Sequence, residues 1–393
     1  MPNLPVSRRG LLSGVASAGL PAAGLILAAS QANAAEAEAP PPEPPVAPRL
    51  PTDHGDLPSF KYHFANSHKK ENAGGWAMEA TVAEFPASKA LAAVNMRLYA
   101  GAYRELHWHA LAAEWAFMLS GHARTTVIDP DGNAETNEFG PGDVWYFPRG
   151  YGHSIQGLGP DGCEFMLVFD DGAFSEFGTF SVTDWLAHTP PEVLAKNLGV
   201  PAAAFAKIPD HELYIMPGTV PPPLPLEPPV GSLVSAPQTH RYPLLAQRPI
   251  EAPGGTVRIV SSKEFPVSTT MTGVIEDINP GAVRELHWHP HADEWQYYVS
   301  GQGRMTVFGS TARAQTWDYR TGDVGYVPRG YGHYIENTGT EPLRVLVVLN
   351  SGVYGDISIS DWLARNPARL VAEHFNLPLD VVARFPKRKV IIA

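Results

Sequence analysis

An identical hexamer, Arg-Glu-Leu-His-Trp-His, occurs at residues 104–109 and again at residues 284–289. The separation of 180 residues recurs in other matching stretches, which are Gly74-Gly75 with Gly254-Gly255, Glu84-Phe85-Pro86 with Glu264-Phe265-Pro266, and His153 with His333. A constant separation over about 80 residues means that both halves share one fold, with almost no insertions between these markers. The repeat therefore restricts the chain to a tandem duplication of one type of domain.

Proline-rich stretches mark the limits of the two halves. A length of 393 residues suits two domains of ordinary size. Residues 35–57 are predicted to form an extended tether, and residues 216–237 are too rich in proline for most folded cores, so they are predicted to be a linker. The expected domains are therefore residues 58–215 and residues 238–393.

Short apolar runs that end in turn residues predict β-strands in both halves. Residues 115–121 and 295–301 are two such runs, and each ends in glycine. The chain contains 36 glycines and 39 prolines, which favours an all-β protein with many turns. We expect two small β-barrels or double-sheet rolls, each followed by short C-terminal helices.

The predicted helices lie at residues 183–200 and 360–377, where Leu, Val and Ala recur at helical spacing. Thr183 and Ser360 are the candidate N-caps of these two segments. Here the separation between equivalent residues falls to 177, so the first half is three residues longer between its last shared histidine and its helix.

The first 34 residues resemble a twin-arginine export signal. Arg8 and Arg9 precede a modestly apolar stretch at residues 10–29, and residues 32–34 are small, as cleavage requires. The alternatives are a membrane anchor or an ordinary secretory signal, but Pro21 and the many small residues disfavour a membrane span. We expect an exported protein, periplasmic or secreted, whose mature form has no membrane segment.

The charge balance limits the partners. The formal net charge is −11, and nothing resembles a basic stripe, which argues against nucleic acid as a partner. An acidic protein also repels anions at long range, so an anionic substrate would have to be captured by local arginines.

Histidines and glutamates recur at the spacing of metal ligands in both halves. Residues two apart in a strand face the same side, so His107 and His109 face together, and His287 and His289 do the same. A glutamate and a third histidine follow each pair, namely Glu114 with His153 and Glu294 with His333. Three imidazoles and one carboxylate without a thiolate suit Mn, Fe, Co, Ni or Zn, with positions left open for small ligands.

Arg104 and Arg284 each lie three residues before the first histidine ligand. In a regular strand this odd spacing places them on the opposite face, but a bulge would return them to the metal side. A guanidinium beside a metal suits a carboxylate substrate, because it can bond both oxygens at once. The alternative is a salt bridge at the surface or at an interface.

Two motifs in each half resemble the cupin pattern. They read Gly101-x5-His107-x-His109-x4-Glu114-x6-Gly121 and Gly142-x5-Pro148-x-Gly150-x2-His153, and the second half repeats both. From about residue 58 onward, stretches such as "GDVWYFPRG", "FDDGAFSE" and "HADEWQYYVSG" are similar to bacterial and fungal oxalate decarboxylases, which are manganese bicupins. The resemblance implies two cupin barrels of the double-stranded β-helix, or jelly-roll, type.

The resemblance also implies the chemistry. Each barrel would bind one Mn, and oxalate would pair with the nearby arginine. Oxalate and a proton would give formate and CO2, with O2 needed as a cofactor but not consumed overall. The family also implies a homo-oligomer.

A lid over the first site, with a glutamate that handles the proton, is a further implication of the resemblance. Glu176 matches that glutamate, and it lies in the segment that is three residues longer in the first half. The two residues after it are Phe177 and Gly178, where the family pattern has Asn and Ser. The second half has no glutamate in its equivalent segment but has Glu336 three residues after His333, where the first half has Gln156.

These differences give the two metal sites different surroundings. Glu336 and Arg284 are the candidate catalytic residues of the second site, and Glu176 and Arg104 are those of the first, where we expect the reaction. Because the lid separates decarboxylation from oxidation in the family, its altered residues leave oxalate oxidase activity as an alternative. A metal-binding bicupin without catalytic activity is another alternative.

Overall fold

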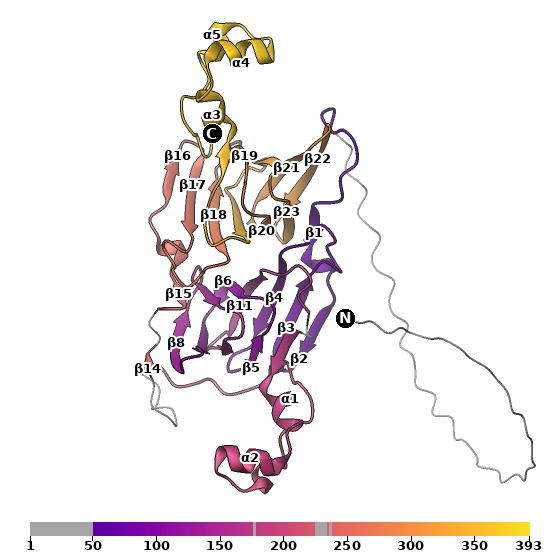
Figure 1. The fold of residues 1–393 in the computed structure, drawn as a ribbon, viewed down its shortest axis with the longest axis vertical. Helices are drawn as coiled ribbons and strands as arrows, with labels where there is room; N and C mark the ends of the chain where they lie inside the picture. The colour runs from indigo at the N-terminus through magenta and orange to yellow at the C-terminus, as the bar shows by residue number, and fades with distance from the viewer. Residues whose placement is uncertain (1–49, 176–177, 225–233, 236–237) are drawn as a thin grey trace, which may run out of the picture. The chain divides into compact units, whose positions relative to one another are not determined.

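Alternating apolar and polar residues produce strands with one buried and one exposed side. The structure is a computed structural model that describes residues 50–175, 178–224, 234–235 and 238–393. In β24 (Gly332–Asn337), for example, every second side chain is buried. Each half contains two sheets of such strands (Figure 1). The all-β fold predicted from the sequence is confirmed.

The first half is built from eleven consecutive strands. One sheet has the order β15-β9-β6-β11-β4-β3-β2, and the other has the order β12-β5-β10-β7-β8-β14, with β13 paired to β5. The bounds are β2 (Lys69–Asn72), β3 (Gly75–Ala80), β4 (Ala92–Leu98), β5 (Tyr103–His109), β6 (Glu114–Gly121), β7 (Ala123–Ile128), β8 (Asn133–Phe139), β9 (Val144–Phe147), β10 (Gly152–Gly157), β11 (Cys163–Phe169) and β12 (Thr179–Ser181).

The second half repeats this arrangement. Its sheets have the orders β1-β23-β20-β25-β18-β17-β16 and β22-β21-β24-β19-β26. Besides β24, the bounds are β16 (Ile250–Ala252), β17 (Gly255–Val260), β18 (Thr272–Ile278), β19 (Val283–Trp288), β20 (Glu294–Ser300), β21 (Gln302–Gly309), β22 (Arg313–Arg320), β23 (Asp323–Val327), β25 (Leu343–Leu349) and β26 (Ile357–Ser358).

The halves exchange their leading strands. β1 (Lys61–His63) lies in the range expected for the first domain, but it pairs with β23 of the second half. β15 (Arg241–Tyr242), which is equivalent to β1 in the repeat, pairs with β9 of the first half. Each half therefore supplies an edge strand to the other, and neither sheet is complete without its partner half.

The stretch that was expected to be a linker contributes short strands to the first half. β13 (Ile215–Met216) pairs with β5, and β14 (Val234–Ser235) pairs with β8 in the parallel direction. The described part of this stretch is thus bound to the sheet along which it runs, because its backbone groups complete the edge hydrogen bonds.

Each half ends in short helices that project away from the sheets in Figure 1. The helices are α1 (Val182–Ala187), α2 (Pro191–Leu198), α3 (Ile359–Ala364), α4 (Ala368–Phe375) and α5 (Leu379–Val382). The predicted segments are each broken in two, because prolines at 190 and 367 end the first helix. The N-caps are Ser181 and Ser358 rather than Thr183 and Ser360, since their hydroxyls accept from backbone N–H groups three residues on.

A continuous apolar core joins the halves. One cluster of buried side chains contains Trp115 and Tyr146 of the first half together with Trp295 and Tyr326 of the second. A Cβ atom placed on Gly273 would lie 2.2 Å from the Trp115 ring, so only glycine allows this close approach. The two halves therefore share one apolar core and are not independently packed domains.

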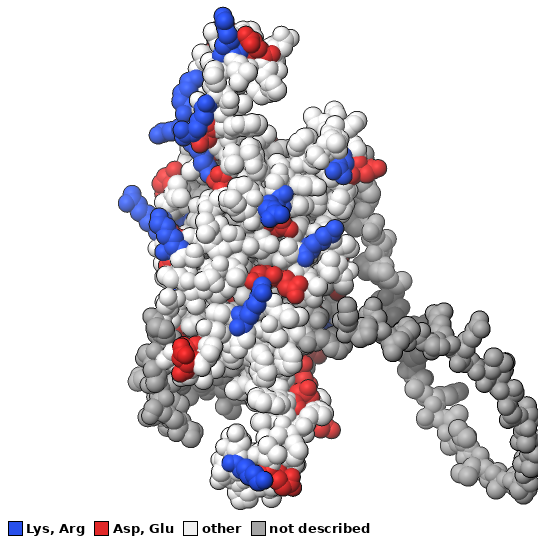
Figure 2. All heavy atoms as spheres, in the orientation of Figure 1, with Lys and Arg blue, Asp and Glu red and all other residues white. Residues whose placement is uncertain are grey.

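The surface carries few charged side chains for its size. Figure 2 shows both signs scattered over the face drawn, without a continuous basic area among the described residues. Within the described parts of the chain, no helix is long and apolar enough to cross a membrane. The predicted signal at residues 1–34 and the tether up to residue 49 lie outside the described residues.

The pairing of β1 with the second half predicts a contribution of Phe60 to stability. Phe60 precedes β1, is buried, and meets the ring of Trp317 edge-on at 5.6 Å in the second half. Phe60→Ala should therefore lower the free energy of unfolding by about 3–5 kcal/mol. Urea unfolding followed by tryptophan fluorescence measures this change. The control is Phe308→Ala, because Phe308 is 53% exposed; equal stability of the two variants would contradict the anchoring role of Phe60.

Candidate metal centres

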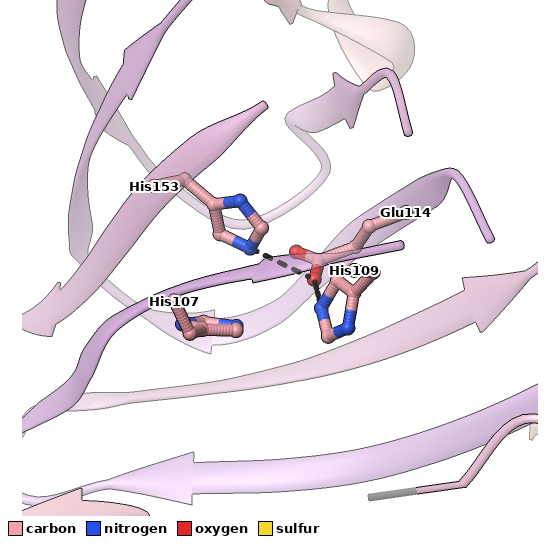
Figure 3. A group of neighbouring side chains, drawn as sticks. All are labelled: His107, His109, Glu114 and His153. Atoms are coloured by element: carbon pink, nitrogen blue, oxygen red, sulfur yellow. Dashed lines mark hydrogen bonds and ion pairs between the residues drawn. The ribbon is translucent and has the colours of Figure 1, made fainter. Parts of the chain in front are cut away.

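Four ligand side chains meet inside the first barrel. His107 and His109 come from β5, Glu114 opens β6, and His153 comes from β10, and all four are buried. Their ligand atoms all lie within 4.8 Å of one another. Figure 3 shows nitrogen atoms of His109 and His153 turned toward the Glu114 carboxylate, at 3.1 and 3.4 Å. The structure thus brings together the four residues that the spacing singled out.

The other ring nitrogen of each histidine is held by the protein. His107 Nδ1 lies 2.6 Å from the Glu105 carbonyl oxygen, and His153 Nδ1 lies 2.8 Å from the Tyr151 carbonyl oxygen. His109 Nδ1 lies 3.0 Å from the Thr179 hydroxyl. Because a carbonyl only accepts, Nδ1 of His107 and of His153 carries the proton, and Nε2 is left with its lone pair facing the cluster.

The cluster has the electrostatics of a cation site. His153 Nε2 is buried and has no hydrogen-bond partner among the described residues. Burial lowers the pKa of His109 to about 4, so this imidazole is neutral at neutral pH. Burial alone would raise the pKa of Glu114, but the neighbouring histidines lower it, which keeps the carboxylate charged. Neutral imidazoles around a charged carboxylate are the protonation states that metal binding requires.

The second barrel contains the same constellation. His287, His289, Glu294 and His333 are buried, and their ligand atoms also lie within 4.8 Å of one another. The Glu294 carboxylate lies 2.7 Å from His289 Nε2 and 3.1 Å from His333 Nε2.

The groups that orient the two glutamates differ, and no sequence pattern indicated them. Trp145 Nε1 donates to Glu114 at 2.7 Å in the first barrel. In the second barrel Gln296 Nε2 donates to Glu294 at 2.6 Å. Trp145 and Gln296 occupy different positions in the repeat, so neither could be found by comparing the halves.

A bulge brings Arg104 to the metal side of β5. His153 of β10 pairs with His107, but Ile155, two residues on, pairs with Arg104, so β5 contains one extra residue. The hypothesis that a bulge returns the arginine is thereby confirmed, because Arg104 lines the same cavity as the ligands. The cavity is lined by Val94, Met96, Arg104, His107, His109, Glu114, Ile155, Leu167, Phe169, Phe174 and Tyr214.

Residues 212–214, which follow the helices of the first half, hold Arg104 in place. Arg104 donates to the Tyr214 carbonyl oxygen at 3.0 Å, and its guanidinium lies 4.2 Å from the centre of the Tyr214 ring. Glu212 forms an ion pair with it at 3.0 Å. Glu105 accepts from the N–H groups of Leu213 and Tyr214 and so fixes this segment. Sequence reasoning missed Glu212 and Tyr214, since they follow the helices and belong to no repeated motif.

An equivalent bulge in β19 returns Arg284 to the metal side, where its partners are two buried carboxylates. His333 pairs with His287, and the register then shifts before Arg284. The Arg284 Nε atom donates to Glu276 at 2.8 Å, and its Nη2 atom donates to Asp356 at 2.7 Å. Asp356 also forms an ion pair with Lys389. Arg284 is therefore balanced by two buried carboxylates.

The structure corrects the prediction for Glu336. Within β24, His333 and Ile335 are buried whereas Glu336 is only half-buried, so its side chain points out of the barrel. The register of β24 against β21 is regular here, and the spacing of three residues leaves Glu336 on the opposite face from His333. Glu336 thus does not adjoin the metal group. Glu176 lies outside the described residues.

Known proteins are similar to this chain along most of its length. A family model described as Cupin matches residues 62–204 and 242–382. The oxalate decarboxylase of Bacillus subtilis is 48% identical over 338 residues, which span 86% of this chain and 87% of that protein. A probable oxalate decarboxylase of Arthroderma benhamiae is 39% identical over 87% of this chain and 84% of its own length. The chain belongs to the oxalate decarboxylase family of bicupins.

Solved structures of the family agree with this assignment. A structure of the Bacillus subtilis oxalate decarboxylase at pH 4.6 has a TM-score of 0.83 at 48% identity, and it covers 87% of this chain and 89% of its own. Another structure, at 47% identity and a TM-score of 0.83, comes from work on the Mn(II) centres of that enzyme. The cupin resemblance and the two-barrel fold predicted from the sequence are therefore confirmed.

Removal of one ligand should empty one centre only. His153→Ala and His333→Ala each take an imidazole from a different buried group. We expect each variant to bind roughly half of the metal that the unmodified protein binds, since every ligand contributes directly to affinity. Elemental analysis after purification measures this. His122→Ala serves as the control, because His122 is exposed; loss of both metals in either ligand variant would contradict two independent centres.

The Arg284 network predicts a pH-dependent loss of stability. Burial would raise the pKa of Asp356, but the charges of Arg284 and Lys389 lower it from 3.8 to about 2. A lowered carboxylate pKa stabilises the fold fully above pH 3.8, and this stabilisation disappears as the pH falls toward 2. Asp356→Asn should cost about 3 kcal/mol at pH 7 and much less near pH 2.

Thermal unfolding at both pH values tests this expectation. The matched control is Asp318→Asn, because Asp318 is 57% exposed in its ion pair with Arg304. A cost of Asp356→Asn that does not change with pH would show that its charge does not stabilise the fold.

Proposed function

We propose that this protein is an oxalate decarboxylase, which converts oxalate and a proton into formate and CO2 in the first barrel. The observation that carries the proposal is Arg104, a buried cation that lines the same cavity as His107, His109 and Glu114. A guanidinium beside a metal group can hold a small carboxylate while the metal binds the other end. The 48% identity to the Bacillus subtilis enzyme supports oxalate as the substrate.

Manganese is the proposed metal, with one ion in each barrel. The donor sets of three imidazoles and one carboxylate suit this ion, and a structure of the Bacillus subtilis relative was determined in work on its Mn(II) centres. When bound, the metal would supply a Lewis acid that polarises the coordinated carboxylate, and O2 is proposed as a cofactor that is not consumed overall. The buried Nδ1 contacts of the histidines keep the imidazoles in the orientation that such binding needs.

Apolar side chains would keep water away from the reaction. Phe169 and Phe174 stack at a centroid distance of 3.7 Å, and Phe174 also meets the His109 ring at 5.4 Å. Loss of CO2 leaves an electron pair on the remaining carbon, which must receive a proton. Water exclusion protects this basic carbon and strengthens the electrostatic interactions within the cavity.

Glu176 is the proposed proton donor. The described residues beside it are tied to the site, because Gly178 N–H donates to Ser175 and the Gly178 carbonyl accepts from Ala110, next to His109. A general acid at this position would form the C–H bond of formate and close the site to solvent. Oxalate oxidase activity, giving two CO2 and H2O2, is the second candidate, since Phe177 and Gly178 depart from the family lid.

We also propose that the mature chain is exported and self-associates. Arg8 and Arg9 support the twin-arginine route, which would allow Mn to be loaded before export, where tighter-binding metals do not compete. Trp185 and Trp362 occupy equivalent positions on α1 and α3 and are 63% and 54% exposed. Large exposed apolar side chains at equivalent places in both halves favour burial against another copy of the chain.

Product analysis tests the function. The Mn-loaded protein, given oxalate in the presence of O2, should release formate and CO2 with little H2O2. Glu176→Gln should reduce formate formation by roughly 100-fold or more while the metal content is unchanged, because only the general acid is lost.

The control for this test is Glu336→Gln, which should retain activity because the Glu336 side chain points away from the barrel interior. Full formate production by Glu176→Gln would contradict the role of Glu176 as proton donor, but it would not contradict the decarboxylase activity. Stoichiometric H2O2 from the unmodified protein would instead assign it as an oxidase.

A further inference from the structure

A position beside the metal group carries different chemistry in the two barrels. Met96 on β4 lines the first cavity beside the metal group. The residue 180 positions later, Glu276 on β18, is a buried acid. A thioether and a carboxylate have similar reach but opposite consequences for an anion, because one is neutral and the other carries charge.

Glu276 contacts Arg284 in the way that a substrate carboxylate would. Its Oε1 atom accepts from Arg284 Nε at 2.8 Å, and the side chain is almost fully buried. Its Oε2 atom is also buried and has no hydrogen-bond partner among the described residues. A buried carboxylate oxygen without a donor is costly unless a cation or a bound water lies nearby. The equivalent residue Met96 lines the first cavity together with His107 and Glu114, so the repeat places Glu276 beside the second metal group.

The Arg284 guanidinium is already occupied. The carboxyl groups of Glu276 and Asp356 both contact it, and Lys389 lies beside Asp356. Arg104 is paired with Glu212 at 3.0 Å and with Glu105 at 3.7 Å, but neither glutamate lines the cavity that Arg104 shares with Met96. The ligand Glu114 is the one carboxylate among the described residues that line this cavity. The first cavity can therefore accept a carboxylate where the second already contains one.

We propose that Glu276 is a built-in carboxylate that occupies the substrate position on Arg284 and closes the second metal centre to oxalate. The second centre then binds its metal without binding substrate, and the reaction takes place in the first barrel alone. This inference rests on the proposed function, because it assumes that the first centre binds a small carboxylate through Arg104.

Exchange of the two residues tests the proposal. Formate is the probe, since it is a small carboxylate that cannot lose CO2 again, and calorimetry on the Mn-loaded protein counts its sites. Glu276→Met should give roughly a twofold rise in the number of formate sites per chain, because the Arg284 Nε–H group that donates to Glu276 becomes available to formate. Met96→Glu should abolish formate binding, because it places a carboxylate opposite Arg104.

Matched measurements separate misfolding from a failed prediction. Met118→Leu changes a buried methionine that does not line the cavity, and it should bind formate as the unmodified protein does. Metal content and thermal unfolding are measured on every variant, so that only folded chains with both metals are counted. The spectrum of Mn(II) in electron paramagnetic resonance should change at the second centre on formate addition only in Glu276→Met.

The outcomes distinguish this inference from the proposed function. An unchanged number of sites in Glu276→Met with both metals bound, or full formate binding by Met96→Glu, would overturn the role of Glu276. Absence of formate production from oxalate by the unmodified protein would instead contradict the proposed function.

Discussion

Burial of a charged carboxylate among three imidazoles is the interaction on which each barrel depends. Such a cluster is unfavourable in an apolar interior unless every polar atom has a partner. The backbone carbonyls of Glu105 and Tyr151 hold two of the imidazoles, and Trp145 holds Glu114, so the remaining lone pairs converge on one point. The barrel is thereby arranged around a cation, and its strands are positioned by the same contacts that position the ligands.

The bulge in β5 and β19 decides what the repeated hexamer can do. One extra residue moves Arg104 and Arg284 from the outer face to the metal side, where they are buried. The partners of the two arginines then differ, since Arg104 pairs with Glu105 and Glu212, which do not line its cavity, whereas Arg284 pairs with Glu276 and Asp356. Identical sequences therefore give different electrostatics, because the partners of the arginine come from other strands and from the chain end.

The halves also depend on each other for stability. β1 and β15 complete sheets in the opposite half, and Trp115 packs against Gly273 across the shared core. Duplication of a complete barrel would not require this exchange. The exchange joins the two halves through shared sheets and one continuous apolar core.

The sequence alone predicted the duplication, the β architecture and the eight residues that form the two groups able to hold a metal ion, because these follow from a fixed offset and from the two-residue period of strands. The arginine at the metal side was predicted only on the condition of a bulge, which the register then supplied. Glu336 was misassigned because its odd spacing from His333 returns it to the metal side only if β24 contains a bulge, and the register of β24 is regular there. The roles of Tyr214 and Glu276 were decided only by tertiary structure, because their contacts join residues from strands or chain ends that the repeat does not connect.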